Sequence, residues 1–365
     1  MNLQTTTGLS KATRLALILT AALTMSVTSA FAQAAPVAPA PAAPTGPAPK
    51  PTGPGSTGVG ILHLNVANLD QSLAFYRDVV GMELTAPPNG PRAGTGLVNE
   101  PGAMLRTAVV KVPGGTFSME LIEWLGTPLR PVQPRIYDGG NVMLAMAVRD
   151  LDGKLAAAKR LGLKILTKDD VPFTNEGRNG ARNRAVMVRD ADGFVVEFTD
   201  SSVPTPNALP GPINNVTVFI SVKDLAQTVE FYNKVFGFTM TAPSPANPAN
   251  ERMKALFFNQ APIASQRAAR GTFPGSEFQV NFQEFSGPTD RKSATHRAQD
   301  PGGPILLVTV QGFPEVIAAI KANGGIVGEG ATSARLAADA RSTWARDPNG
   351  VLLRVSLPPA TNSRQ

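Results

Sequence analysis

Histidine and cysteine, the side chains that most often carry nucleophilic and metal chemistry, are scarce in this chain of 365 residues. It contains two histidines, His63 and His296, and no cysteine. These residues do not assemble into a Ser–His–Asp or a Cys–His nucleophile set. His296 lies in the polar stretch DRKSATHRAQD, where we expect exposure to solvent.

A cluster of arginines in NEGRNGARNR is a second place for chemistry, at Arg178, Arg182 and Arg184. Guanidinium groups so close together could clamp a carboxylate or a phosphate. The alternative is a solvated loop, because loops are usually polar surface. The glycines of GTGLVNEPG and RIYDGGN do not follow the strand-to-helix geometry of a phosphate loop, so no nucleotide site is expected.

His63 lies in a predicted strand. Every second residue from Leu62 to Val66 is apolar, which is the period of a strand, and His63 and Asn65 stand between them. The apolar side then packs beneath the following helix, while Ile61, His63 and Asn65 share the opposite face.

This strand opens a segment that occurs twice at one fixed offset. VANLDQSLAFYRDVVGMELTAPP aligns without gaps with VKDLAQTVEFYNKVFGFTMTAPS. Each copy predicts a strand, a capped helix and a glycine stop. Asn68 or Asp70 can cap the first helix, and Gly81 and Gly237 stand where a helix end favours a left-handed residue. Such self-similarity indicates that one supersecondary unit was copied.

Four strand–helix–strand modules fill the chain after residue 58. The first continues with strands TAVVKV and FSMELIEW, and the second has strand NVMLAMAVRDL, helix DGKLAAAKRLG and strands KIL, NRAVMVRD and GFVVEFTD. The third has NVTVFISV, helix LAQTVEFYNKVFG, and strands KALFFN and EFQVNFQEF. The fourth has PILLVTVQG, helix PEVIAAIKANGG and TWARDPNGVLLRV. We predict one domain over 58–202, a proline-rich linker over 203–212, a second domain over 213–358 and a tail over 359–365.

The four modules resemble the glyoxalase/bleomycin-resistance/dioxygenase superfamily, also called vicinal oxygen chelate proteins. LDQSLAFYRDVVG and LAQTVEFYNKVFG match the opening strand–helix, and RDADGFVVEF and RDPNGVLLRV match the closing hairpin. The resemblance implies an α+β fold with tandem domains, in each of which two βαβββ modules form a cup-shaped mixed sheet. It implies the fold more strongly than the reaction, because one scaffold hosts many activities.

The resemblance also implies a metal site, since enzymes of this superfamily often hold a divalent ion through one residue from each of four strands. Carried over by position, two ligands fall on Glu120 and Glu197, and the other positions hold Ile61 and Met143. His63, one pleat from Ile61, would complete a set for zinc, manganese, iron or nickel. A hydrogen-bonded cleft histidine is the alternative.

Glu123 has the opposite parity to Glu120 on the same strand, and Glu284 stands at the equivalent place in the third module. This equivalence indicates that Glu123 is the structural glutamate. Two carboxylates facing one cavity also need a cation, an arginine or a shared proton between them.

The second domain lacks a comparable donor set. Its corresponding positions are Thr217, Asn281, Ile305 and Arg354, which cannot hold a divalent ion together. We expect a structural partner or a metal-free cup here, with Phe219 and Phe282 as lining or core residues.

The leading hypothesis is a metal-dependent lyase, isomerase or oxygenase of this superfamily that acts on a small oxygenated molecule. Glu120 or Glu197 would exchange protons during catalysis. Candidate ligand-binding residues are Asn65, Met143, Arg178, Arg182 and Phe219. The alternative is a metal-free protein of the bleomycin-resistance kind that sequesters an apolar or aromatic ligand; a third possibility is a scaffold whose cups are filled by side chains.

The N-terminus predicts export. Lys11 and Arg14 precede the apolar run LALILTAALTMSV and the small residues of Ala30-Phe31-Ala32, the pattern of a signal peptide over 1–32. An uncleaved anchor is the alternative, although the run is short for a bilayer. The Pro/Ala-rich stretch 33–57 predicts a disordered linker.

We therefore expect a periplasmic or secreted protein without stable membrane insertion after cleavage. The formal charge of +7 is not gathered into a dense basic run, so no nucleic-acid partner is expected. The predicted assembly is a monomer with pseudo-dimeric domains or a homodimer.

Overall fold

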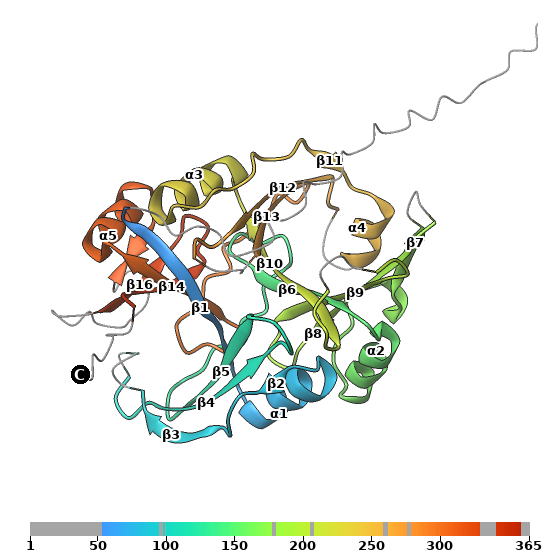
Figure 1. Cartoon of the computed structure of the whole chain (residues 1–365), viewed down its shortest axis with the longest axis horizontal. Helices are drawn as coiled ribbons and strands as arrows, with labels where there is room; N and C mark the ends of the chain where they lie inside the picture. Colours follow the sequence, from blue (N-terminus) through green and yellow to red (C-terminus); the bar gives the residue numbers. More distant parts are fainter. Residues whose placement is uncertain are drawn as a thin grey trace, which may run out of the picture. The chain divides into compact units, whose positions relative to one another are not determined.

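The structure is a computed structural model, shown in Figure 1, and describes residues 53–94, 98, 100–176, 180–204, 208–257, 262–275, 279–328 and 341–358. All of them belong to the unit Pro44–Gln365. The predicted signal peptide, most of the predicted linker, and Arg178 lie outside the described residues. The first strand begins at Gly55, so the predicted linker is wrong for its last three residues.

The four predicted modules are present in order. The first comprises β1 (Gly55–Val66), α1 (Leu69–Leu73), the π-helix η1 (Ala74–Val79), β2 (Glu83–Leu84), β3 (Asn89–Ala93), β4 (Met104–Lys111) and β5 (Ser118–Leu125). The second comprises β6 (Val142–Val148), α2 (Leu151–Arg160), the 3₁₀-helix η2 (Lys168–Asp170), β7 (Phe173–Glu176), β8 (Arg182–Arg189) and β9 (Val195–Ser201). The third comprises β10 (Ile213–Val222), α3 (Leu225–Phe236), β11 (Asn247–Pro248), α4 (Glu251–Leu256), β12 (Ser265–Thr272) and β13 (Gln279–Ser286). The fourth comprises β14 (Pro304–Gln311), α5 (Phe313–Ala322), β15 (Ile326–Val327), β16 (Ser342–Arg346) and β17 (Leu352–Ser356).

The predicted cap of the first repeated helix and the two predicted glycine stops are confirmed. The Asn68 side chain accepts a hydrogen bond of 2.9 Å from the Gln71 amide, which satisfies one of the free amides at the start of α1. Gly81 and Gly237, the two predicted stops, have φ of 87° and 71°, a conformation that costs glycine least.

Two predicted strands are wrong. KALFFN lies partly in α4, because Asn250 caps a helical turn by accepting a 2.9 Å hydrogen bond from the Met253 amide. The strand of that module is β12 instead, and its sequence SQRAARGT escapes prediction because it lacks alternating large apolar residues. KIL contributes only an isolated bridge from Ile165 to Val188.

The strands form two sheets, and each sheet combines modules from both halves of the chain. Sheet A joins the first and fourth modules in the order β15-β16-β17-β14-β1-β5-β4-β2, with β3 on β4. Sheet B joins the second and third in the order β11-β12-β13-β10-β6-β9-β8-β7. The joints are the antiparallel pairs β1–β14 and β10–β6 (Figure 1). The predicted α+β class is confirmed, while the partnering of first with fourth and second with third modules is a finding of the structure.

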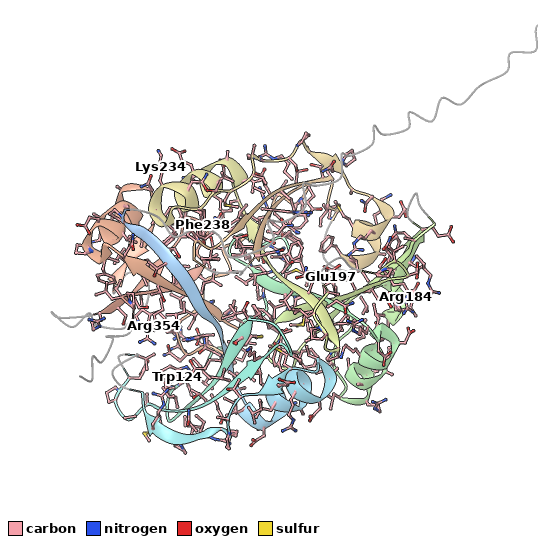
Figure 2. The ribbon with its side chains drawn as sticks, viewed as in Figure 1. Trp124, Arg184, Glu197, Lys234, Phe238 and Arg354 are labelled. Carbon is pink, nitrogen blue, oxygen red and sulfur yellow. The ribbon has the colours of Figure 1, made fainter. Side chains whose placement is uncertain are left out.

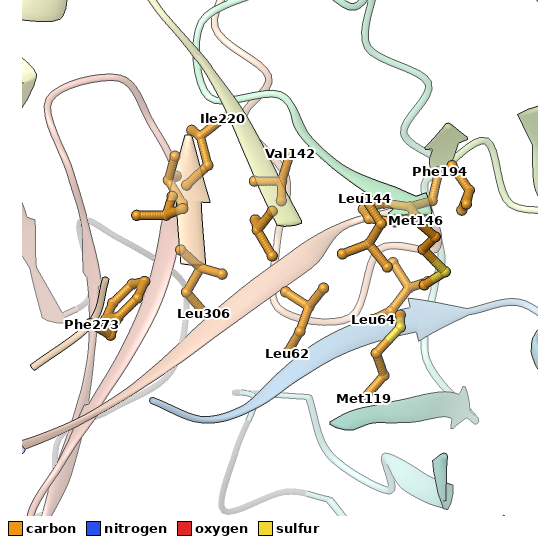
Figure 3. Packing of buried hydrophobic residues seen from close by; sticks show 14 of the residues in the cluster. Leu62, Leu64, Met119, Val142, Leu144, Met146, Phe194, Ile220, Phe273 and Leu306 are labelled. Carbon is orange, nitrogen blue, oxygen red and sulfur yellow. The ribbon is translucent and has the colours of Figure 1, made fainter. Parts of the chain in front are cut away.

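Both sheets bury one face in a shared apolar core. Leu62 and Leu64 of β1 and Leu144 and Met146 of β6 belong to this core and are fully buried (Figure 3). Burying such a side chain stabilises a fold by about 1.5–3 kcal/mol. Since side chains alternate along a strand, the residues between these point to the opposite face of each sheet. We call these opposite faces cup A and cup B.

The closing hairpins are tied to the repeated helices of the same half. The Tyr76 hydroxyl donates 2.8 Å to Asp190, and the Tyr232 hydroxyl donates 3.2 Å to Asp347 at the equivalent place. Burial raises the pKa of Asp190 to about 7 and that of Asp347 to about 6. In each half of the chain, a hydrogen bond thus joins the first module to the second, although the strands of these two modules belong to different sheets.

None of the helices in the described part of the chain combines the length and apolar character needed to cross a bilayer.

Candidate functional site

Cup A receives one side chain from each of four neighbouring strands. His63 on β1 is in register with Glu120 on β5 and with Ile305 on β14. On the next strand, Leu353 and Val355 enter the shared core, so Arg354 points into the cup from β17. These are the strand positions that the sequence pattern singles out, now brought together from the first and fourth modules.

The predicted pair His63 and Glu120 is in contact. His63 Nε2 lies 3.2 Å from Glu120 Oε2, and the exposed fractions of the two side chains are 7% and 19%. Burial, and secondly Arg354, lowers the pKa of His63 to about 4, so the imidazole is neutral at pH 7. Burial raises the pKa of Glu120, against the opposing effects of Arg92, a hydrogen bond from Thr107, and Arg354. A neutral imidazole with its proton on Nε2 can donate to this carboxylate.

Arg354 is the cation of cup A. It is half-buried, and its guanidinium carbon lies 5.9 Å from the centre of the Trp344 ring. Burial lowers its pKa, although Glu120 acts in the opposite direction. Arg92, on the exposed strand β3, acts on both Glu120 and Arg354 through its charge.

An apolar cluster forms the rest of cup A. It contains both tryptophans of the chain, Trp124 and Trp344, together with Ile122, Ile305 and Leu352. In Figure 2, Trp124 and Arg354 lie beside β1, away from Glu197.

Asn65, predicted to bind ligand, is occupied within the protein. Its amide nitrogen donates 2.8 Å to the Gly303 carbonyl, and its oxygen accepts 3.0 Å from Trp124 Nε1. Asn65 therefore orients the wall of cup A.

Cup B is closed by α4. Arg252 of this helix forms an ion pair with Glu197, which points into the cup from β9. Met253 and Leu256 of the helix pack into the same apolar cluster as Met143 and the partly buried Phe219, both predicted to bind ligand. Burial raises the pKa of Glu197 and Arg252 opposes this rise. Cup B is thus filled by the protein's own side chains.

The remaining positions of the second predicted domain divide between cup and core. Asn281 is buried in cup B on β13, and its Oδ1 has no hydrogen-bond partner among the described residues. Phe282, the next residue, belongs to the shared core and is fully buried, which confirms its structural role.

The predicted grouping of His63, Glu120 and Glu197 around one ion is wrong. The first two side chains lie in sheet A and Glu197 lies in sheet B, because β1 pairs with β14 and β10 with β6. Within the described ranges, no three His, Cys, Asp or Glu side chains are placed to hold a metal ion.

The donors of cup A do not fit a divalent metal. Only two of the four strand positions, His63 and Glu120, offer a metal ligand. The other two hold the alkyl side chain of Ile305 and the cation of Arg354. Protein sites for such ions need three or four donor ligands, and a neighbouring guanidinium repels the ion. In cup B the carboxylate of Glu197 is paired with Arg252.

The arginine cluster does not form an anion clamp among its described members. Arg184 pairs with Asp200 and with Asp152, so it has a structural role. Arg182 is exposed, and its backbone amide donates 2.8 Å to Ser202 Oγ.

His296 is buried, contrary to the expectation for a polar loop. Its Nδ1 lies 2.9 Å from the Arg297 carbonyl, and burial lowers its pKa to about 4. Arg297 and Asp300 of the same loop form an ion pair of 2.6 Å, and Arg346 donates a hydrogen bond to the His296 carbonyl.

The structural role predicted for Glu123 is confirmed. Glu123 pairs with Arg106 at 2.8 Å, and its equivalent Glu284 pairs with Arg267 at 2.6 Å. Arg92 and Arg252 were not predicted as site residues, because they lie outside the repeated motifs. The available signal was the pair of carboxylates Glu120 and Glu197, since a carboxylate that faces a cavity requires a cation.

Comparisons with known proteins agree with this geometry. The model of the Glyoxalase/Bleomycin resistance protein/Dioxygenase superfamily matches residues 58–198 and 213–355. No curated protein matches the chain. Among solved structures, glyoxalase I from Zea mays is similar with a TM-score of 0.52 and 17% identity, covering 82% of this chain and 92% of that one.

Two further solved structures are similar over a shorter stretch of this chain. A glyoxalase family protein from Bacillus cereus has 18% identity and a TM-score of 0.33, covering 40% of this chain and 93% of its own. An antibiotic binding protein from Streptomyces has 19% identity and a TM-score of 0.25, covering 40% of this chain and 95% of its own.

Proposed function

This chain belongs to the glyoxalase/bleomycin resistance protein/dioxygenase superfamily, and we propose that it binds a small, largely apolar molecule in cup A without a metal ion. The observation that carries the proposal is the side chain at the closing-strand position. Arg354 stands there, facing His63 and Glu120, where a metal site would need a donor.

The surroundings of Arg354 support binding of an apolar or aromatic body. Trp124, Trp344 and Ile122 form the buried apolar wall of the cup, while Leu307 and Arg354 remain partly exposed beside them. Pockets for small molecules are commonly apolar with a few placed polar groups. Cup B is the weaker candidate, because α4 fills it.

Tryptophan fluorescence tests this proposal directly, since both tryptophans of the chain belong to the cluster of cup A. We expect phenylbutyl compounds, which do not absorb at the excitation wavelength of tryptophan, to give a saturable change in fluorescence of the full mature chain. Dialysis against EDTA should leave the titration unchanged.

A matched pair of variants locates the site. Leu307→Phe adds bulk next to Arg354 in cup A and should weaken binding, whereas Ala145→Phe adds bulk next to Glu197 in cup B and should not. Loss of binding after EDTA treatment, restored by a divalent ion, would overturn the proposal.

A further inference from the structure

The guanidinium of Arg354 lacks a partner of its own in the described part of the chain. Among these residues it donates no hydrogen bond and forms no ion pair; its neighbours are the Trp344 ring, whose centre lies 5.9 Å from the guanidinium carbon, and the charge of Glu120. A buried or half-buried guanidinium is normally paired, because desolvating its five N–H donors without acceptors costs free energy. Arg354 therefore has donors free for a ligand.

Glu120 does not use up this cation. Its carboxylate already contacts His63 Nε2 at 3.2 Å and accepts a hydrogen bond from Thr107. Arg92 adds a second positive charge that acts on both Glu120 and Arg354. With His63 neutral, two cations face one carboxylate, so cup A has an uncompensated positive charge.

The positive charge of Arg354 and the apolar wall lie on the same face of sheet A. Arg354 is in register with Trp344 on β16 and with Leu307 on β14. A ligand whose acidic group meets Arg354 can therefore place an apolar body against the partly exposed Leu307. Guanidinium groups bind carboxylates through two parallel hydrogen bonds, which favours a planar monoanion over a neutral polar group.

We propose that the ligand of cup A is a small monocarboxylate with an apolar or aromatic body, held at its carboxylate by Arg354. This inference rests on the proposed function and names the class of molecule that the same cup takes. The positive surplus is the reason to prefer an acid over an alcohol, an amide or an amine.

The test compares three isosteric probes on the full mature chain by tryptophan fluorescence at pH 7: 4-phenylbutanoate, 4-phenylbutanamide and 4-phenylbutylamine. We expect the carboxylate to bind about tenfold more tightly than the amide, the size of a charge-assisted hydrogen-bond pair. The amine should bind most weakly.

Three variants test whether Arg354 causes the preference for the carboxylate over the amide. Arg354→Gln should bring the carboxylate to the affinity of the amide, and Glu120→Gln should strengthen carboxylate binding by removing the neighbouring negative charge. Lys234→Gln removes an exposed cation from α3, whose buried side chains pack into the shared core and not into cup A, and should change neither affinity. Thermal unfolding of each variant confirms that it is folded.

The outcomes separate this inference from the proposed function. Equal affinity for acid and amide, or an unchanged preference in folded Arg354→Gln, would overturn the carboxylate assignment while leaving a metal-free binding cup. Failure of all three probes to bind would overturn both.

Discussion

At the scale of single residues, the alternation of side chains along a strand predicted which face of the sheet each residue occupies, but not which residues it contacts. His63 and Glu120 were both expected on the open face, and they meet at 3.2 Å. Glu197 also faces a cup, yet it meets Arg252, a residue outside any repeated motif. Parity follows from the two-residue period of a strand, whereas an ion pair depends on tertiary packing that no local pattern encodes.

Burial of His63 should make stability depend on pH. Its pKa is about 4 in the folded protein and 6.5 in the unfolded chain, so the unfolded state binds the proton first as the pH falls. The contribution of neutral His63 to the free energy of unfolding is complete above pH 6.5. It is lost as the pH falls towards 4, which lowers the unfolding free energy by about 3 kcal/mol.

Denaturant unfolding of the protein and of His63→Gln between pH 7 and pH 4 measures this effect as a difference. His296, Asp190 and Asp347 titrate in the same window but are common to both proteins, so their contributions cancel. A difference in unfolding free energy that stays constant with pH would show that His63 titrates equally in both states.

At the scale of elements, the internal repeat predicted the cap of the first repeated helix and both glycine stops, because these depend on neighbouring residues. It failed at KALFFN, where Asn250 begins α4, and at β12, whose small side chains give no period. Nor could it choose strand partners: β1 satisfies the same alternation whether it pairs with the second or the fourth module. In the structure β1 pairs with β14 of the fourth module, and the apolar faces of both strands join the shared core.

Helix α4 should depend on the contact between Arg252 and Glu197. Arg252→Ala leaves a buried carboxylate without its partner, and we expect a loss of about 1–3 kcal/mol in unfolding free energy, reduced because the Arg252 side chain is 36% exposed. Denaturant titration at pH 7 measures it.

Lys254→Ala is the matched control on the same helix, since Lys254 is exposed and pairs only with exposed Glu251 among the described residues. It should change stability by no more than about 0.5 kcal/mol. If Arg252→Ala were as neutral as this control, or if adding Glu197→Gln did not recover stability, the contact would not hold α4 in place.

At the scale of the whole molecule, each half depends on the other for its sheets. Sheet A needs β14 to β17 beside β1, and sheet B needs β10 to β13 beside β6. Hydrophobic periodicity predicted four modules but could not predict this exchange, because either partnering buries the same faces. Family matches over 58–198 and 213–355 mark the sequence repeat, not the sheets.

A cut in the proline-rich stretch 203–212 should therefore leave the halves associated. We expect limited proteolysis there to give two fragments on a denaturing gel that elute as one species by size exclusion. The physical reason is that separation would expose the joint edges of β1 and β10 and the shared apolar core. Two fragments that separate without denaturant would contradict the shared sheets.

We also propose that the protein is exported, on the basis of its N-terminal sequence. Mass analysis of protein exported by a bacterial host should find a chain that begins near Gln33, after the small residues of Ala30-Phe31-Ala32. An intact Met1 on soluble cytoplasmic protein would overturn this proposal.

The central claim is that cup A unites His63 and Glu120 with Arg354, and that Arg354 is what keeps a divalent ion out. Titration of Zn²⁺ or Ni²⁺ into the full-length protein, followed by elemental analysis, tests it through Arg354→Glu. That variant would place a third anionic or imidazole donor in the cup, and we expect it to gain about one tightly held ion per chain. The protein itself and Arg354→Gln, which removes the cation without adding a donor, should gain none. A stoichiometric ion in the unaltered protein that is lost in Glu197→Gln would contradict the account, because it would require His63, Glu120 and Glu197 to converge after all.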